Sequence, residues 1–269
     1  MNTHSDEHHG STTYTSTGTL MGKVFMWLFL CQDALMFMGF FAAYISVRIG
    51  AGNLWPSPET HVQGVEHYPL NIPLTALNTF VLICSSVTMV MAVQAAHWKN
   101  IKKTILWLAL TVIGGSIFLG IQYGEYYHLI VNDGMGMEKS LFDATFFSLT
   151  GFHGIHVFSG VAYLLSLVIA LLMGPIDSHK KESYWLINLW RLVCVGITLF
   201  MFFNVTKKWP PLPHVLIPIV AGAVPYIMVR GIRWMRTRHD TGDIVEVAGL
   251  YWHFVDLIWI ILFTLVYLI

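Results

Sequence analysis

Long apolar runs separated by short polar segments dominate this chain. A helix needs about 20 such residues to cross the hydrocarbon core of a bilayer with every backbone amide satisfied internally. The pattern predicts an all-α, polytopic transmembrane helix bundle that forms a single domain over residues 21–269. It predicts about seven spans, at about residues 22–48, 70–97, 104–130, 143–174, 184–206, 211–234 and 246–269.

Lysine and arginine are unequally distributed between the loops on the two sides of these spans. If the amino terminus lies inside, ten basic residues fall in inner segments and four in outer ones. Basic residues concentrate in short cytoplasmic loops. The pattern therefore predicts that the amino terminus is inside and the carboxyl terminus outside.

Composition supports the membrane assignment and limits the partners. Hydrophobic residues make up 55% of the chain and charged residues 11%, whereas soluble domains carry about 25% charged residues. The formal net charge is zero, so we expect no nucleic-acid partner. Cys31, Cys84 and Cys194 lie in apolar runs without a CxxC or Cys/His ligand spacing, so we expect buried structural thiols and no metal site.

The first 20 residues form a polar segment rich in Ser, Thr and His. They lack the basic region and the small-residue cleavage site of a signal peptide, so we expect a retained cytoplasmic tail. His4, His8 and His9 titrate near neutral pH. They are either a proton antenna at the inner surface or part of a polar tail without that task.

Asp33 is the clearest polar residue inside a predicted span. It lies about ten residues into the first run, roughly 15 Å along a helix axis. A carboxylate at that depth has to be protonated or paired. A proton-accepting or lipid-organising site and a neutral acid hydrogen-bonded to a neighbouring helix both explain it.

Five further polar residues lie in or at the ends of the spans. His153 and His156 are three residues apart, so spacing places them on one helix face, and we expect them to form interhelical hydrogen bonds. His253 and Asp256 have the same spacing, with the aspartate either accepting from that histidine or capping a group on another subunit. Glu125 is read as a snorkelling interfacial carboxylate or as a functional one.

Arg191 lies in the inner part of the fifth predicted span. It is expected to bind a lipid phosphate, to pair with a carboxylate or to snorkel toward the inner surface.

Three segments resemble the signature segments of haem-copper oxidase subunit III and occur in that family's order. They are QYGEYY at 122–127, TFFSLTGFHGIHV at 145–157 and YWHFVDLIW at 251–259. Asn78-Thr79, and Asp33 followed by Gly39-Phe40-Phe41, extend the resemblance upstream. It covers about residues 21–173 and 243–269. Residues 177–242 then read as an inserted helical hairpin relative to the family, with an expected partner of its own.

The resemblance implies a non-catalytic, non-redox subunit of a proton-pumping terminal oxidase in aerobic respiration. Such a subunit binds no haem or copper, packs mainly on subunit I, holds phospholipids in a cleft and supports proton uptake. The haems and copper are expected in partner subunits, and subunit II and other oxidase or supercomplex subunits are further expected partners. A multi-pass location in the bacterial inner (plasma) membrane follows.

The resemblance also assigns roles to individual residues. The family's buried, carbodiimide-reactive carboxylate corresponds to Asp33, which is glutamate in mitochondrial members and aspartate in bo-type quinol oxidases. The lipid cleft and inter-helix polar network are expected to include the following residues: Glu125, His153, His156, His253, Asp256 and, without support from the family, Arg191.

Three alternatives remain open from the sequence. Asp33 and residues 127–132 resemble the quinol-oxidase versions, so quinol can replace cytochrome c as the electron donor. A stand-alone proton-coupled transporter that uses Asp33 would be active alone in liposomes. A haem-binding cytochrome that uses His153 would show haem bands as an isolated chain.

Overall fold

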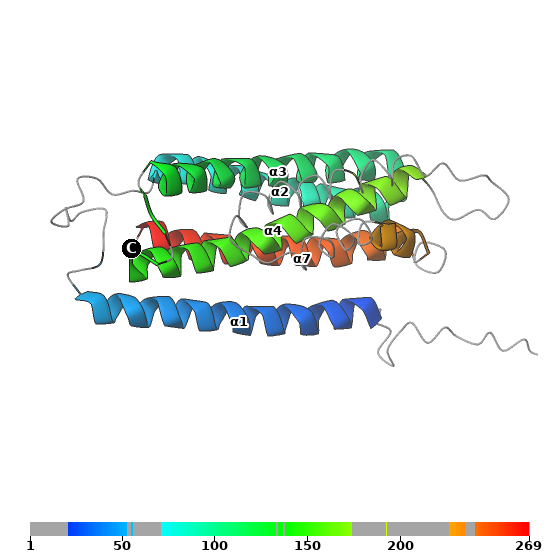
Figure 1. Ribbon diagram of the computed structural model, residues 1–269. Helices are drawn as coiled ribbons and strands as arrows, with labels where there is room; N and C mark the ends of the chain where they lie inside the picture. The colour runs from blue at the N-terminus through cyan, green and yellow to red at the C-terminus, as the bar shows by residue number, and fades with distance from the viewer. Residues whose placement is uncertain are drawn as a thin grey trace, which may run out of the picture.

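The computed structural model describes residues 21–52, 55, 71–132, 134–136, 138–173, 192, 226–234 and 240–268, and every regular element within them is helical (Figure 1). The long helices are α1 (Met21–Ala51), α2 (Ile72–His97), α3 (Ile101–Val131), α4 (Leu141–Met173) and α7 (Thr241–Phe263). A short π-helical turn, η2 (Thr264–Leu268), continues α7.

Five helices among the described residues are long and apolar enough to cross a membrane. They coincide with the first four predicted spans and the last one. The chain is therefore a multi-pass membrane protein with an all-helical fold. The predicted spans at 184–206 and 211–234 fall largely outside the described residues. The total of about seven spans and the orientation of the termini thus stay predictions.

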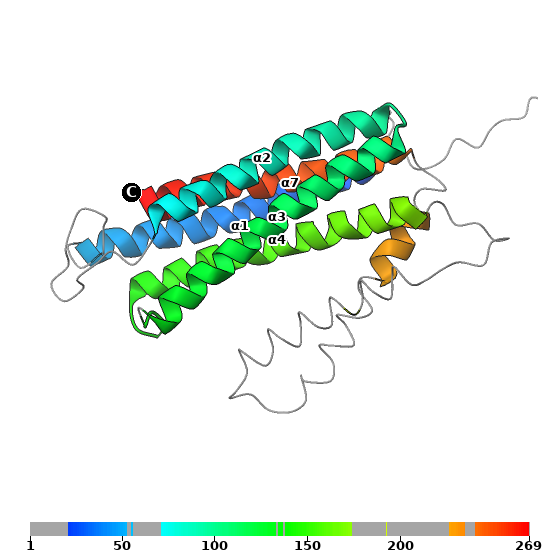
Figure 2. The same cartoon turned by 90° about the horizontal axis from the view of Figure 1, so that it is seen from above.

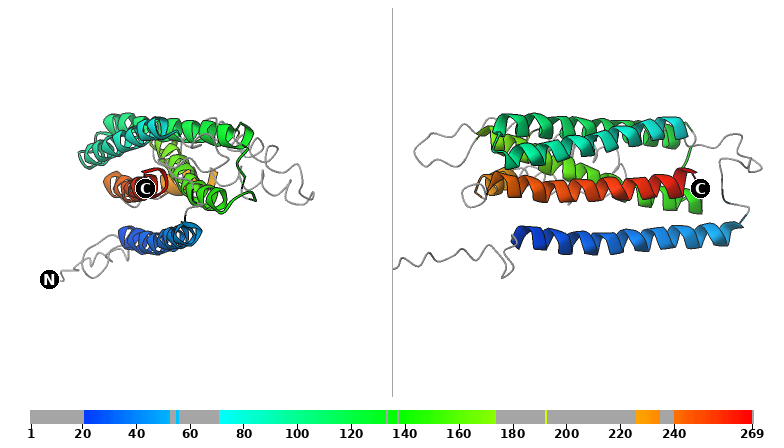
Figure 3. Two further views of the ribbon diagram at one scale, coloured as in Figure 1. Left: turned by 90° about the vertical axis from the view of Figure 1, so that its left-hand side faces the viewer. Right: turned by 180° about the vertical axis from the view of Figure 1, so that it is seen from behind.

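The helices α2, α3, α4 and α7 pack into a bundle, and α1 lies along its outer side against α4 and α7 (Figure 1, Figure 3). Figure 2 shows α2 and α3 meeting at the short turn that joins them and spreading apart toward their other ends. The buried residues of α1 recur every three or four positions and form one stripe: Leu30, Asp33, Phe37, Phe41 and Tyr44. Most of the other side chains of α1 are exposed, among them Phe25, Leu28 and Leu35.

Two tryptophans of α7 hold the bundle together from its centre. Trp252 Nε1 donates to Ser85 Oγ of α2 at 3.1 Å, and Trp259 Nε1 donates to Thr79 Oγ1 of α2 at 2.9 Å. Gly115 of α3 makes room for the first ring, because a Cβ there would lie 2.5 Å from Trp252 Cη2. Small residues let membrane helices approach closely, and hydroxyl groups satisfy the buried indole N–H groups.

Charged side chains gather where α1 and α7 begin and α2 ends. Lys23 Nζ lies 2.8 Å from Glu246 Oε2 and 3.5 Å from Asp243 Oδ1. His97 Nε2 lies 3.3 Å from Glu246 Oε2. Glu246 therefore connects the amino-terminal end of α1 with the carboxyl-terminal end of α2, so three helices are held together at this end of the molecule.

The prediction of buried cysteines is wrong for Cys31 and Cys84. Both are free thiols on exposed surfaces of α1 and α2. An apolar run shows that a residue lies in the membrane, but it does not distinguish a side chain facing lipid from one facing the bundle. Cys194 lies outside the described residues.

We expect that Gly115→Val destabilises the fold by about 1–3 kcal/mol, as overpacking of a filled core does. The added side chain would meet Trp252 Cη2 at 2.5 Å and Val161 Cγ2 at 2.7 Å. The measurement is the unfolding of the purified chain in mixed detergent micelles, followed by circular dichroism.

The matched control is Gly120→Val on the same helix, where a Cβ meets no atom within 4 Å. Both variants place the same β-branched residue in α3, so the intrinsic helix preference changes equally. Equal unfolding midpoints for the two variants would show that the Trp252 contact does not limit stability.

Candidate functional site

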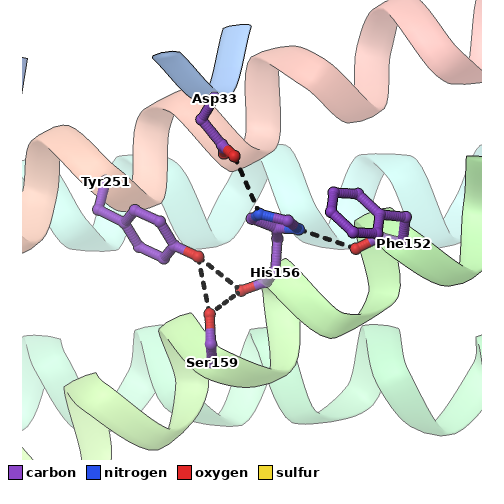
Figure 4. Close-up of polar contacts among 5 residues, drawn as sticks. All are labelled: Asp33, Phe152, His156, Ser159 and Tyr251. Atoms are coloured by element: carbon purple, nitrogen blue, oxygen red, sulfur yellow. Dashed lines mark hydrogen bonds and ion pairs between the residues drawn. The ribbon is translucent and has the colours of Figure 1, made fainter. Parts of the chain in front are cut away.

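Asp33 lies in the middle of α1 and faces His156 of α4 (Figure 4). Its Oδ1 atom is 3.2 Å from His156 Nε2. Asp33 is only 6% exposed, and a charged side chain at the centre of a membrane helix costs at least about 2.5 kcal/mol. The two side chains therefore form a polar contact between helices in an otherwise apolar layer.

The hydrogen bonds of His156 define where its protons lie. Nδ1 is 2.8 Å from the backbone carbonyl oxygen of Phe152, which can only accept, so Nδ1 carries a hydrogen. Contact between Nε2 and Asp33 Oδ1 then requires a second proton between them, because a bare nitrogen lone pair would repel a carboxylate. The pair can consist of a protonated Asp33 with a neutral His156, or of an ionised Asp33 with a protonated His156. Both forms have no net charge, and in each the two side chains share one transferable proton.

Aromatic rings surround this pair. The ring of His156 lies 5.2 Å from the Phe37 ring in an edge-on arrangement and 4.8 Å from the Phe152 ring, measured between centroids. Asp33 Oδ2 is buried and has no hydrogen-bond partner in the described part of the chain. The surroundings favour a neutral pair, since apolar rings solvate an isolated charge poorly.

Two hydroxyl groups support the backbone that carries His156. Ser159 Oγ donates to the carbonyl oxygen of His156 at 2.8 Å, and Tyr251 Oη of α7 donates to the same oxygen at 3.2 Å. The two hydroxyl oxygens lie 2.7 Å apart. Sequence reasoning did not select either residue, although Tyr251 opens the third signature segment.

The expectation of interhelical hydrogen bonding is wrong for His153. It is 1% exposed, and neither ring nitrogen has a hydrogen-bond partner among the described residues. Its ring instead stacks on Trp259, with centroids 5.0 Å apart, and meets the edge of Phe118 at 6.0 Å. Three residues correspond to less than a full helical turn, which turns His153 into the bundle while His156 faces α1.

Glu125 is also buried, at 7% exposure, so its interpretation as a snorkelling interfacial carboxylate is wrong. It accepts hydrogen bonds from Thr75 Oγ1 at 3.1 Å, Gln122 Nε2 at 3.3 Å and Tyr267 Oη at 3.2 Å. These donors come from α2, α3 and η2. The carboxyl group therefore joins three elements where α2 begins and α3 and η2 end.

Asp256 and His253 meet through a residue of another helix. Ser86 Oγ of α2 donates to Asp256 Oδ2 at 2.6 Å and lies 3.2 Å from His253 Nδ1. The aspartate thus reaches the histidine of its own helix by way of Ser86. Sequence reasoning did not select Ser86 as the residue that joins them.

The remaining predicted residues cannot be placed. Arg191 and the tail histidines His4, His8 and His9 lie outside the described residues, so their roles stay predictions. Within the described part of the chain, no group of three or more His, Cys, Asp or Glu side chains is arranged to hold a metal ion.

Comparison of the sequence with known proteins identifies the family of this chain. The family model described as Cytochrome c oxidase subunit III matches residues 2–210. Cytochrome c oxidase subunit 3 of Thermostichus vulcanus is 30% identical over 90% of this chain and 84% of its own length. The same subunit of Alkalihalophilus pseudofirmus is 27% identical over 98% of this chain and 95% of its own length.

A quinol-oxidase protein is similar as well. The Cytochrome bo(3) ubiquinol oxidase subunit 3 of Pseudomonas aeruginosa is 26% identical over 90% of this chain and 82% of its own length. These matches extend along the sequence through the helices that carry Asp33, Glu125 and His156. The chain belongs to the cytochrome c oxidase subunit III family.

Proposed function

We propose that this chain, as subunit III of a haem-copper oxygen reductase, is a non-redox subunit that supports proton uptake through Asp33 and His156. It packs on subunit I of a proton-pumping cytochrome c oxidase and holds phospholipids. It contacts subunit II and further oxidase or supercomplex subunits, and the haems and copper reside in partner subunits. Its place is the bacterial plasma membrane, with about seven spans, the amino terminus inside and the carboxyl terminus outside.

The Asp33–His156 pair is the observation that carries this proposal. The Asp33 Oδ1–His156 Nε2 contact of 3.2 Å holds a proton midway along α1, and the Phe152 carbonyl fixes the other imidazole hydrogen. An acid facing a base of this kind can accept and release a proton without separating the two helices. This behaviour suits a subunit that helps a proton-consuming neighbour.

The outward surface of α1 supports the assignment of lipid and protein partners. Large apolar side chains are exposed along its length: Phe25, Trp27, Leu28, Leu35, Met38 and Ile49. In a bilayer such a surface contacts acyl chains or the transmembrane helices of another subunit. The same helix carries Asp33 on its buried face. A partner that contacts the exposed side of α1 therefore lies next to the helix that carries the Asp33–His156 pair.

Quinol oxidation is the second candidate for the complex. The relative from Pseudomonas aeruginosa bears the name of a ubiquinol oxidase subunit. In addition, Asp33 is an aspartate, which the resemblance associates with quinol oxidases at this position. The donor site belongs to another subunit in either case.

We expect Asp33→Asn to reduce oxygen turnover of the assembled oxidase by about tenfold at alkaline pH. Charged sites raise the association rate of an oppositely charged ion by about ten- to a thousandfold, and the expected loss is the lower end of this range. The carboxamide can still donate to His156 Nε2, so the contact remains while the exchangeable acid is lost. At alkaline pH free protons are scarce, so the loss of an uptake group has its largest effect there. Turnover is measured against pH in proteoliposomes.

Asp33→Glu is the matched control, since it restores a carboxyl group with one more methylene. It should recover most of the turnover at alkaline pH. A wild-type pH profile for Asp33→Asn, in enzyme that still contains the subunit by gel analysis, would contradict a role of the pair in proton uptake.

The orientation is tested with single cysteines in a chain whose Cys31, Cys84 and Cys194 are replaced by alanine. Lys102→Cys lies in the first turn of α3, and Glu138→Cys lies in the connection to α4. We expect a membrane-impermeant maleimide on intact spheroplasts to label the Glu138→Cys chain alone. After permeabilisation it should label both. Labelling of Lys102→Cys before permeabilisation would reverse the assigned topology.

Native purification through a tag on this chain tests the complex as a whole. We expect haem-copper subunits to co-purify and to give haem bands in a reduced-minus-oxidised spectrum, with cytochrome c rather than quinol supporting oxygen consumption. A chain that is recovered alone and is active in liposomes would favour the transporter alternative. Haem bands from the isolated chain would favour the cytochrome alternative.

A further inference from the structure

We propose that Tyr251 is a positioning residue through which α7 holds His156 against Asp33. The inference rests on the proposed role of the Asp33–His156 pair and adds a residue to it. Figure 4 shows the arrangement: Asp33 reaches His156 from one side, and the Tyr251 hydroxyl reaches the backbone of His156 from the other.

The carbonyl oxygen of His156 receives more hydrogen bonds than its place in a helix requires. A helical carbonyl ordinarily accepts from the N–H group four residues later. Here Tyr251 Oη also donates to it at 3.2 Å, and Ser159 Oγ donates at 2.8 Å. The two hydroxyl oxygens are 2.7 Å apart, and each hydroxyl group has a single hydrogen, so Tyr251 binds this oxygen either directly or through Ser159. The turn of α4 that carries His156 is therefore attached to α7 by the Tyr251 hydroxyl.

The ring of Tyr251 is held in place independently of its hydroxyl. Gly160 lies beneath it, and a Cβ at that position would be 3.2 Å from Tyr251 Cε1. On the side of α1, the Phe29 ring packs at a centroid distance of 6.2 Å. Tyr251 therefore contacts α1 and α4 at once, so removal of the hydroxyl alone leaves its packing intact.

The Asp33–His156 contact is sensitive to small movements of this turn. Its length of 3.2 Å is at the upper end of the hydrogen-bond range. The Phe152 carbonyl fixes the rotation of the imidazole at Nδ1, but Phe152 and His156 belong to the same helix. Tyr251 ties this part of α4 to α7, which in turn packs against α1.

Tyr251→Phe in the intact oxidase tests the proposal by infrared spectroscopy. The Asp33 band is identified as the carboxyl or carboxylate stretch that disappears in Asp33→Asn. We expect Tyr251→Phe to shift this band, because a loosened contact with His156 changes the hydrogen bonding of the carboxyl group. Turnover at alkaline pH should fall, but by less than in Asp33→Asn.

Tyr163→Phe is the matched control, since Tyr163 lies on α4 one turn beyond Ser159 and its hydroxyl has no hydrogen bond to a described residue. It should leave the band and the turnover unchanged. Ser159→Ala is the second positive variant, because it removes the other donor to the His156 carbonyl while keeping the donor from α7. A smaller shift is expected there.

The outcomes separate the two proposals. If Asp33→Asn alters the pH profile but Tyr251→Phe and Ser159→Ala leave the Asp33 band in place, the pair functions and the positioning role is wrong. If the band shifts in Tyr251→Phe while Asp33→Asn has normal turnover, the positioning holds and the proposed role in proton uptake is wrong. A loss of stability in Tyr251→Phe with an unchanged band per assembled enzyme would reduce Tyr251 to a packing residue.

Discussion

The contact between Asp33 and His156 is the constraint on which the position of α1 depends. Inside a bilayer, apolar side chains gain little by moving from lipid to protein, so packing and polar contacts decide where a helix lies. Asp33 cannot face acyl chains without a large free-energy cost. Its distance of 3.2 Å from His156 therefore sets both the rotation of α1 and its register against α4.

The same rule organises the bundle beyond α1. Glu125 accepts from donors of α2, α3 and η2, and Asp256 accepts from Ser86 of α2. Ser85 and Thr79 of α2 accept from the indole groups of Trp252 and Trp259. The small polar residues of α2 thus form hydrogen bonds with groups on other helices. Each bond fixes the position of one helix along its neighbour, which apolar packing alone would not determine.

The sequence predicts the helices well and their contacts poorly. Apolar length alone located the five described membrane helices, and the depth of Asp33 followed from counting residues. The orientations of His153 and His156 could not be predicted in this way. A helix that is apolar all round carries no amphipathic signal to show which side faces the bundle. The burial of Glu125 depends on Tyr267, which lies 142 residues later and returns to it only in the folded chain.

Three of the buried carboxyl groups, those of Asp33, Glu125 and Asp256, differ in what surrounds them. Glu125 is bound by hydroxyl and amide groups, and Asp256 by a hydroxyl, none of which changes its protonation near neutral pH. Asp33 instead faces an imidazole directly, a side chain whose ring nitrogens can each donate or accept a proton. A proton can therefore pass between acid and base at that site while both helices stay in place. Because this group lies on α1, at the edge of the bundle, the proposed exchangeable proton lies on the helix that exposes a large apolar surface.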